Sequence, residues 1–235
     1  MINFAVRADA VRLCLPYIST EETRYYLNGV CFEPGPDGKG VLAVATDGHK
    51  LGVAYDEQGV FVGSGDKRPI VRREALMVSA LAPKKDDNVR WLVVRDQVAL
   101  VVIAGSAEEA LDLEPLTERT KAVACGVLID SGVLIDSMFP AWRGAVPRKG
   151  EDDGWPAFNA RYLKAISDGY AKVAGKNPAM MRLTSTGASG AALINFAGNP
   201  DLPEFFAMLM PMKWDESKAD RPEWLGLEAK KKAAA

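Results

Sequence analysis

The sequence lacks the features that mark several classes of protein. Its 235 residues include one histidine and three cysteines, and no CxxC or Cys/His spacing predicts a zinc site. No apolar run approaches the roughly 20 residues that cross a bilayer, and the first residues lack the pattern of a signal peptide. We therefore expect a cytoplasmic protein with no metal, no cofactor and no membrane partner. Cys14, Cys31 and Cys125 each lie among apolar residues and are predicted to be buried, unpaired thiols.

Catalytic motifs are missing as well. The segment GPDGKG (residues 35–40) is rich in glycine, but it has no Walker spacing and no helix is predicted to follow it. The small residues at 185–190 lack the GxSxG context of a nucleophile elbow. The aspartate pairs at 86–87 and 152–153 fall in polar segments that are typical of solvated loops. The sequence therefore predicts a protein that is not an enzyme.

The net charge of −2 argues against a protein that is held to nucleic acid by bulk positive charge. Basic residues nevertheless recur in each segment that is predicted to be helical, whereas acidic residues gather in 108–114, 151–153 and 215–220. A charge on a helix is usually only part of a solvated face. Because basic residues recur in successive helices, a second interpretation is that these helices present a basic face that binds phosphates.

One order of elements occurs three times along the chain. Alternating apolar residues at 2–6 predict a strand, helical spacing predicts a helix up to Pro16, and apolar runs within 24–56 predict the strands that follow. The order returns from Ile70 and again after residue 155, with a helix capped by Asn159. This repeat predicts an α+β fold of β-α-β-β-β units, with helices on one face of antiparallel sheets.

Three stretches carry a resemblance to a known family. RYYLNGVCFE with VATDGHKLGVA, both within 24–54, resembles the middle domain of the bacterial DNA polymerase III β sliding clamps. LIDSMFPAWRGAVPRK (134–149) is similar to the connector that enters the last clamp domain, and FFAMLMPMKW (205–214) is similar to the terminal strand. The resemblance implies a DNA-clamp fold in which helices line a central hole and sheets form the rim.

The resemblance also implies a division of the chain and a departure from the family. Residues 1–147 correspond to a clamp domain of two units, 155–214 to a single unit from the second half of the last domain, and 215–235 form an added tail. Family rings contain about a dozen units, so four copies of this chain would complete one. We expect a homo-oligomer, a tetramer first, with a ring of another size or an unclosed monomer as alternatives. The tail carries Trp224 between charged residues, and either docks in an apolar groove or is disordered.

The resemblance places a peptide-binding pocket between the middle and last domains. Flexible methionines and leucines suit varied apolar anchors. Met208 and Met210 could equally be core residues of a terminal strand, and His49 alone would be a turn residue. The pocket residues that the resemblance implies are Leu27, Thr46, Gly48, His49, Lys50, Leu51, Pro147, Met208 and Met210.

A second set of residues is predicted to face DNA. Contacts of this kind would go to phosphates, without sequence preference and with strong salt dependence. The aromatic pair at 25–26 could stack on an unpaired base, or could simply pack at a strand start. The set comprises Arg7, Arg12, Arg24, Tyr25, Tyr26, Arg72, Arg73, Arg161, Lys164 and Lys172.

Together these features predict a sliding clamp. Such a processivity factor encircles duplex DNA and tethers a DNA polymerase, and it meets the polymerase and a clamp loader through short linear peptides. The alternative is a clamp-derived adaptor or regulator that binds clamp-binding peptides without encircling DNA. An inactive remnant is the third interpretation.

Overall fold

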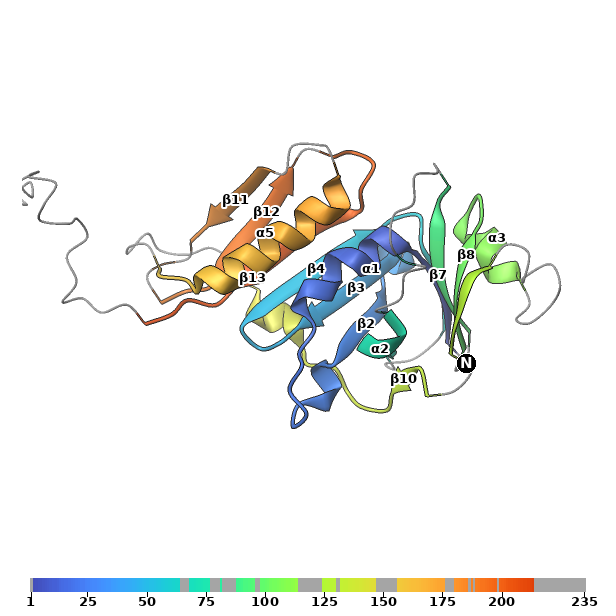
Figure 1. The fold of residues 1–235 in the computed structure, drawn as a ribbon, viewed down its shortest axis with the longest axis horizontal. Helices are drawn as coiled ribbons and strands as arrows, with labels where there is room; N and C mark the ends of the chain where they lie inside the picture. Colours follow the sequence, from blue (N-terminus) through green and yellow to red (C-terminus); the bar gives the residue numbers. More distant parts are fainter. Residues whose placement is uncertain are drawn as a thin grey trace, which may run out of the picture.

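The computed structural model describes most of the chain. The described residues are 2–63, 68–76, 81, 88–95, 98–113, 124–129, 132–146, 156–175, 180–185, 187, 189–197 and 199–213. Their elements form two antiparallel sheets with helices packed against them (Figure 1), which confirms the α+β class. No helix within these ranges is long and apolar enough to cross a membrane.

The first unit follows the predicted order. It contains β1 (Asn3–Arg7), α1 (Ala8–Cys14), β2 (Gly29–Pro34), β3 (Val41–Thr46), β4 (Lys50–Asp56) and the short β5 (Val60–Val62). The helix continues as a single 3-10 turn from Leu15 to Tyr17, where Pro16 lies at its start. Gly40 takes φ +68°, so the left-handed turn between β2 and β3 needs glycine at this position.

The second unit repeats this order with one insertion. It contains β6 (Ile70–Arg72), α2 (Arg73–Leu76), β7 (Arg90–Arg95), β8 (Val98–Ile103), β9 (Ala124–Ile129) and the short β10 (Leu134–Ile135). The predicted hairpin is confirmed, because β7 and β8 pair along their whole length. The charged segment after β8, predicted as an excursion, contains α3 (Ala107–Asp112), whose N-terminus is capped by the Ser106 side chain.

The third unit contains α5 (Ala160–Ala174), β11 (Met180–Thr184), β12 (Ala192–Ala197) and β13 (Glu204–Leu209). Asn159 caps α5 as predicted, since its side-chain oxygen accepts a hydrogen bond from the Arg161 N–H at 2.9 Å. Gly175 ends the helix at φ +66°, where a residue with a Cβ would be strained. Among the described residues before α5, an isolated bridge from Ala157 to Met212 takes the place of a first strand.

The strand order links the units in two different ways. The five-stranded sheet runs β5-β1-β7-β8-β9, and the eight-stranded sheet runs β10-β6-β2-β3-β4-β13-β12-β11. The first two units exchange their first strands, because β1 pairs with β7 and β6 pairs with β2. The first and third units meet instead through their last long strands, β4 and β13.

The helices α1 and α5 lie side by side on one face of the eight-stranded sheet (Figure 1). Their approach is close where Gly169 of α5 meets Pro16, since a Cβ at Gly169 would lie 2.4 Å from the proline ring. The main apolar core fills the space between the helices and the sheets. A second apolar cluster lies on the other face of the eight-stranded sheet, away from these helices.

The cysteines are confirmed as buried and unpaired where the structure describes them. Cys14 faces the main core and Cys31 the second cluster, and both are free thiols. Burial raises the pKa of both thiols well above its ordinary value, so neither is a reactive thiolate. The side chain of Cys125 lies outside the described part of the chain.

Candidate functional site

The junction between β4 and β13 brings together several of the predicted pocket residues. Leu51 and Met208 are opposite each other in the register, and the Met210 N–H donates to the His49 carbonyl at 2.9 Å. Leu51, Met208 and Leu27 belong to one buried cluster. Met210 follows β13 and is 42% exposed. The junction is therefore a buried apolar cluster with an exposed methionine, Met210, just beyond the end of β13.

Sequence reasoning missed the residues that cover the rest of this cluster. The segment 132–146 crosses the sheet and contributes Ile135, Phe139 and Trp142, all of them buried. Tyr26 and Phe206 pack at the edge of the same cluster. Phe139 and Trp142 were the available signal that this segment packs on the protein, because large aromatic residues are seldom fully exposed in a linker.

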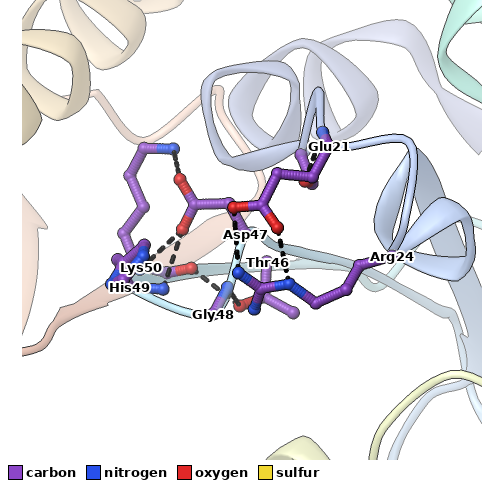
Figure 2. Close-up of polar contacts among 8 residues, drawn as sticks. Glu21, Arg24, Thr46, Asp47, Gly48, His49 and Lys50 are labelled. Carbon is purple, nitrogen blue, oxygen red and sulfur yellow. Dashed lines mark hydrogen bonds and ion pairs between the residues drawn. The ribbon is translucent and has the colours of Figure 1, made fainter.

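Hydrogen bonds from side chains fix the corner between β3 and β4 (Figure 2). The Asp47 carboxylate accepts from the N–H groups of His49 and Lys50, each at 2.9 Å. Thr46 donates its hydroxyl to the Lys50 carbonyl at 2.8 Å and accepts from the Gly48 N–H at 3.1 Å. Gly48 has φ +88°, a conformation that strongly favours glycine. The predicted turn at Asp47 and Gly48 is thus a rigid corner.

The corner divides the predicted pocket residues between two faces of the sheet. Lys50 is buried, its Nζ pairs with Asp47 at 2.5 Å, and the same nitrogen lies 5.6 Å from the centre of the Tyr162 ring. The His49 ring stacks on Tyr162 with 5.7 Å between centroids. Successive strand residues point to opposite faces, so Lys50 lies on the helix side while Leu51 lies in the cluster. Pro147 lies outside the described residues.

Glu33 fastens the connector over the sheet. This carboxylate is buried and accepts from the Trp142 indole N–H at 3.0 Å and from Arg143 at 2.6 Å. Arg68 Nη1 lies 3.2 Å from Glu33 Oε1, the oxygen that also accepts from Trp142. The Arg143 guanidinium also lies over the Trp142 ring, 4.4 Å from its centre. Glu33 therefore holds the aromatic lid of the second cluster in place.

We expect Glu33→Ala to lower the free energy of unfolding by about 1–3 kcal/mol, because the buried Trp142 N–H loses its acceptor. The half-exposed arginines can be hydrated in the variant, which keeps the effect below that of a fully buried pair. Urea denaturation at fixed protein concentration measures the change. The exposed Glu57→Ala is the matched control and should shift stability by less than about 0.5 kcal/mol. Equal effects of the two substitutions would contradict the role given to Glu33.

Two of the predicted DNA-facing arginines are engaged inside the protein. Arg7 pairs with the buried Asp56 at 2.9 Å and donates to the Asp201 carbonyl at 3.0 Å. Arg12 pairs with Asp9 at 2.8 Å and donates to the Lys172 carbonyl at 2.9 Å, which ties α1 to α5. Both guanidiniums are largely buried, at 17% and 11% exposure. They act as internal ties, which the spacing of charges along a helix does not reveal.

The loop before β2 carries both an ion pair and aromatic side chains. Both Arg24 guanidinium contacts go to Glu21, at 2.7 and 2.9 Å, and the hydrogen bond from Arg24 lowers the pKa of that carboxyl. Tyr25 is 54% exposed and meets the Tyr26 ring edge-on at 6.1 Å. Of this predicted set, Tyr25 is the side chain that is most available to stack on a base.

An exposed basic stripe does lie along α5. Arg161, Lys164 and Lys172 are all exposed, and they fall at helical spacing. Lys164 pairs with Asp168 at 2.7 Å, but both side chains are at least half exposed, so this pair holds the lysine weakly. Arg72 is also exposed, and Arg73 is half-buried at the start of α2.

Comparison with known proteins gives this architecture a context. No protein-family model matches the sequence. The chain is 29% identical to the β sliding clamp of Caulobacter vibrioides over 157 residues, which is 66% of this chain and 34% of the relative. The β subunit of DNA polymerase III from Pseudomonas aeruginosa superposes with TM-score 0.58 at 16% identity, covering 91% of this chain and 67% of that one.

A second solved structure extends the match. The sliding clamp of Bartonella birtlesii, bound to griselimycin, superposes with TM-score 0.54 at 19% identity over 90% of this chain and 66% of that one. The chain therefore has the fold of the β sliding clamps. It matches about a third of the length of the curated relative and about two thirds of each solved chain.

Proposed function

We propose that this protein is a non-catalytic processivity factor. Copies of it encircle duplex DNA in the cytoplasm and tether a DNA polymerase through the apolar surface at the β4–β13 junction. A clamp loader opens the ring through a peptide that binds at the same surface. Tethering raises the effective concentration of the polymerase at the primer, because the polymerase can leave the primer end without leaving the duplex.

The observation that carries the proposal is the junction itself. It brings Leu27, Leu51 and Met208 from distant parts of the sequence into one buried apolar cluster beside a rigid corner, and the exposed Met210 is bonded to that corner through the His49 carbonyl. Flexible methionine at such a margin suits anchors of different shape. His49 and Lys50 belong to the corner and lie against Tyr162. The pocket that we propose is lined by Leu27, Thr46, Gly48, Leu51, Met208 and Met210.

Griselimycin offers a probe, because the Bartonella birtlesii clamp was solved with it bound. We propose that it binds this chain at the junction and competes with a labelled polymerase peptide. The competition is followed by fluorescence anisotropy. A labelled peptide that binds but is not displaced by griselimycin would argue against a shared pocket.

The proposed ring places α5 toward the duplex. Its exposed stripe carries Arg161, Lys164 and Lys172, while α1 offers a partly buried face on which Asp9 and Arg12 neutralise each other. Phosphate contacts would therefore come mainly from the third unit, with Arg72 and Tyr25 as further candidates. The bond between Arg12 and the Lys172 carbonyl holds α1 and α5 in register for this role.

The triple substitution of Arg161, Lys164 and Lys172 by alanine should flatten the salt dependence of DNA binding. Each lost phosphate contact changes the slope of log K against log salt by about 0.9, so the slope should fall by about 2.7. Filter binding to duplex DNA over a salt series measures it. Lys39→Ala, an exposed lysine on the turn between β2 and β3, is the control and should leave the slope unchanged. An unchanged slope in the triple variant would exclude α5 as the DNA-facing helix.

Encirclement has its own test. Protein loaded on nicked circular DNA should remain bound through gel filtration and should be released when a restriction enzyme linearises the circle. Release at equal rates from circular and linear DNA would show that no closed ring forms.

One observation favours the second candidate, an adaptor or regulator that binds clamp-binding peptides without encircling DNA. Arg7 and Arg12 are held in internal ion pairs, which leaves fewer free cations on the helical face than the sequence predicts. For an adaptor the peptide affinity would persist, while both the salt slope and the retention on circular DNA would be absent.

A further inference from the structure

The three units share a feature that the long strands alone do not show. In each unit, a short strand after the last long strand returns to pair with the first strand of the same unit. β5 pairs with β1 and β10 pairs with β6. In the third unit the Met212 N–H donates to the Ala157 carbonyl at 2.8 Å, and the two residues form an antiparallel bridge. Ala157 therefore occupies the first-strand position of the third unit, directly before α5.

First strands do not stay in their own units. β1 joins the sheet of the second unit by pairing with β7, and β6 joins the sheet of the first unit by pairing with β2. In both cases the acceptor is the first strand after the helix. Each of the two units thus donates one strand and accepts one, and together they form a closed pair.

The third unit has neither contact among the described residues. β11, the first strand after α5, is the last strand of its sheet and has a neighbour on one side only. The Ala157–Met212 bridge is likewise isolated from both sheets. Both the donor and the acceptor of a strand exchange are present, and both are unused.

Burial agrees with β11 having β12 as its one neighbour among the described strands. The equivalent strands β2 and β7 are buried along almost their whole length. Every residue of β11 is exposed except the half-buried Leu183, and Met180 and Met181 are 60% and 36% exposed. An open edge strand with exposed methionines is a template for another strand.

We propose that two copies of this chain exchange the strands around Ala157. The Ala157 segment of each copy pairs with β11 of the other, and the two third units form a closed pair like that of the first two units. The contact is two-fold, so each copy gives and receives the same strand. A second copy is the fitting occupant because the same unit presents the donor and the acceptor.

The internal repeat also predicts the register. Ile70 and Ala157 each lie three residues before the start of the following helix, and Ile70 is opposite Cys31, the third residue of β2. The third residue of β11 is Arg182. Its neighbour Leu183 packs on the main core, so Arg182 lies on the other face, as Cys31 does. Ala157 of one copy is therefore expected opposite Arg182 of the other.

This contact constrains the ring proposed above, and that consequence rests on the proposed function. The described units follow one another as second, first and third, with the exchange on one side of the first unit and the β4–β13 pairing on the other. The free side of the third unit is of the exchange kind, whereas the second unit ends at β9, a last long strand. A third unit therefore meets a third unit by strand exchange, and a second unit meets a second unit through β9. A ring with these two alternating two-fold contacts has an even number of copies.

A disulfide tests the exchange without DNA. In the double variant Ala157→Cys/Arg182→Cys, opposed residues on antiparallel strands are about 4.5–5.5 Å apart at Cα, which a disulfide can span. Mild oxidation should give a covalent dimer and nothing larger on a non-reducing gel, whereas each single variant should stay monomeric. Free thiols throughout, a bond within one chain, or a ladder of larger species would each overturn the two-fold exchange.

A second measurement separates the contact from the function. Met180→Glu/Met181→Glu places charge on the exposed edge of β11 and should halve the native mass, because each copy loses its exchange partner. Met138→Glu, at 89% exposure on the connector, is the matched control and should keep the full mass. An unchanged native mass in the β11 variant would overturn the proposal. Both measurements are free of DNA, so a failure of loading on circles leaves them standing, and their failure leaves the peptide and DNA tests intact.

Discussion

Asp56→Ala should lower the free energy of unfolding by about 3–5 kcal/mol, because it leaves a largely buried guanidinium without its partner. The Asp56 carboxylate is fully buried and accepts from the Arg7 N–H at 2.7 Å and from its Nε at 2.9 Å. Arg7 joins the end of β1 to the start of α1 and also reaches the Asp201 carbonyl in the third unit. Losing the carboxylate therefore loosens a point where the first and third units meet.

A double-mutant cycle tests this assignment. Arg7→Met/Asp56→Leu removes both charges at once and should be less destabilised than the sum of the single substitutions, since neither charge is left buried alone. Urea denaturation is run at one protein concentration, because assembly contributes to the apparent stability. Additive single effects, or a loss of less than about 1 kcal/mol for Asp56→Ala, would show that the pair is not a structural tie.

Met210→Glu should weaken binding of a labelled polymerase peptide by about 30- to 150-fold, equivalent to about 2–3 kcal/mol. Met210 directly follows β13, its side chain is 42% exposed, and its N–H donates to the His49 carbonyl at 2.9 Å. A bound apolar anchor would remove water from the new carboxylate, which costs free energy. Fluorescence anisotropy measures the change.

Met138→Glu is the matched control for this prediction as well. It introduces the same charge at an exposed methionine outside the cluster and should change peptide affinity less than twofold. The thermal midpoints of both variants should stay close to that of the parent, because both side chains are exposed. Full peptide affinity in Met210→Glu would move the binding surface away from the β4–β13 junction.

The local rules of the sequence succeeded where a few neighbouring residues decide the structure. Asn159 caps α5, Asp47 and Gly48 form the corner, and β7 and β8 form the predicted hairpin. Each depends on a backbone conformation or a strand alternation that operates over a few residues. The order of the elements and their repeat could therefore be predicted from the sequence.

Only part of the candidate site could be predicted from the sequence. Leu27, Leu51 and Met208 share one buried cluster, and their role in a peptide pocket stays a prediction. The tie between Glu33 and Trp142 went unnoticed, because it joins residues that are far apart in the chain. Pairings over such separations leave no periodic signal in a sequence.

The sequence by itself determined which segments become strands and helices, because apolar alternation, helical spacing and turn residues act locally. Only the tertiary structure decided on which face of the sheet each residue lies and which partners it contacts. It turned Lys50 toward Tyr162 and away from Leu51, and it buried Arg7 against Asp56. It also left β11 with an open edge. Strand pairing and desolvation set these outcomes, and both depend on neighbours that only the folded chain brings together.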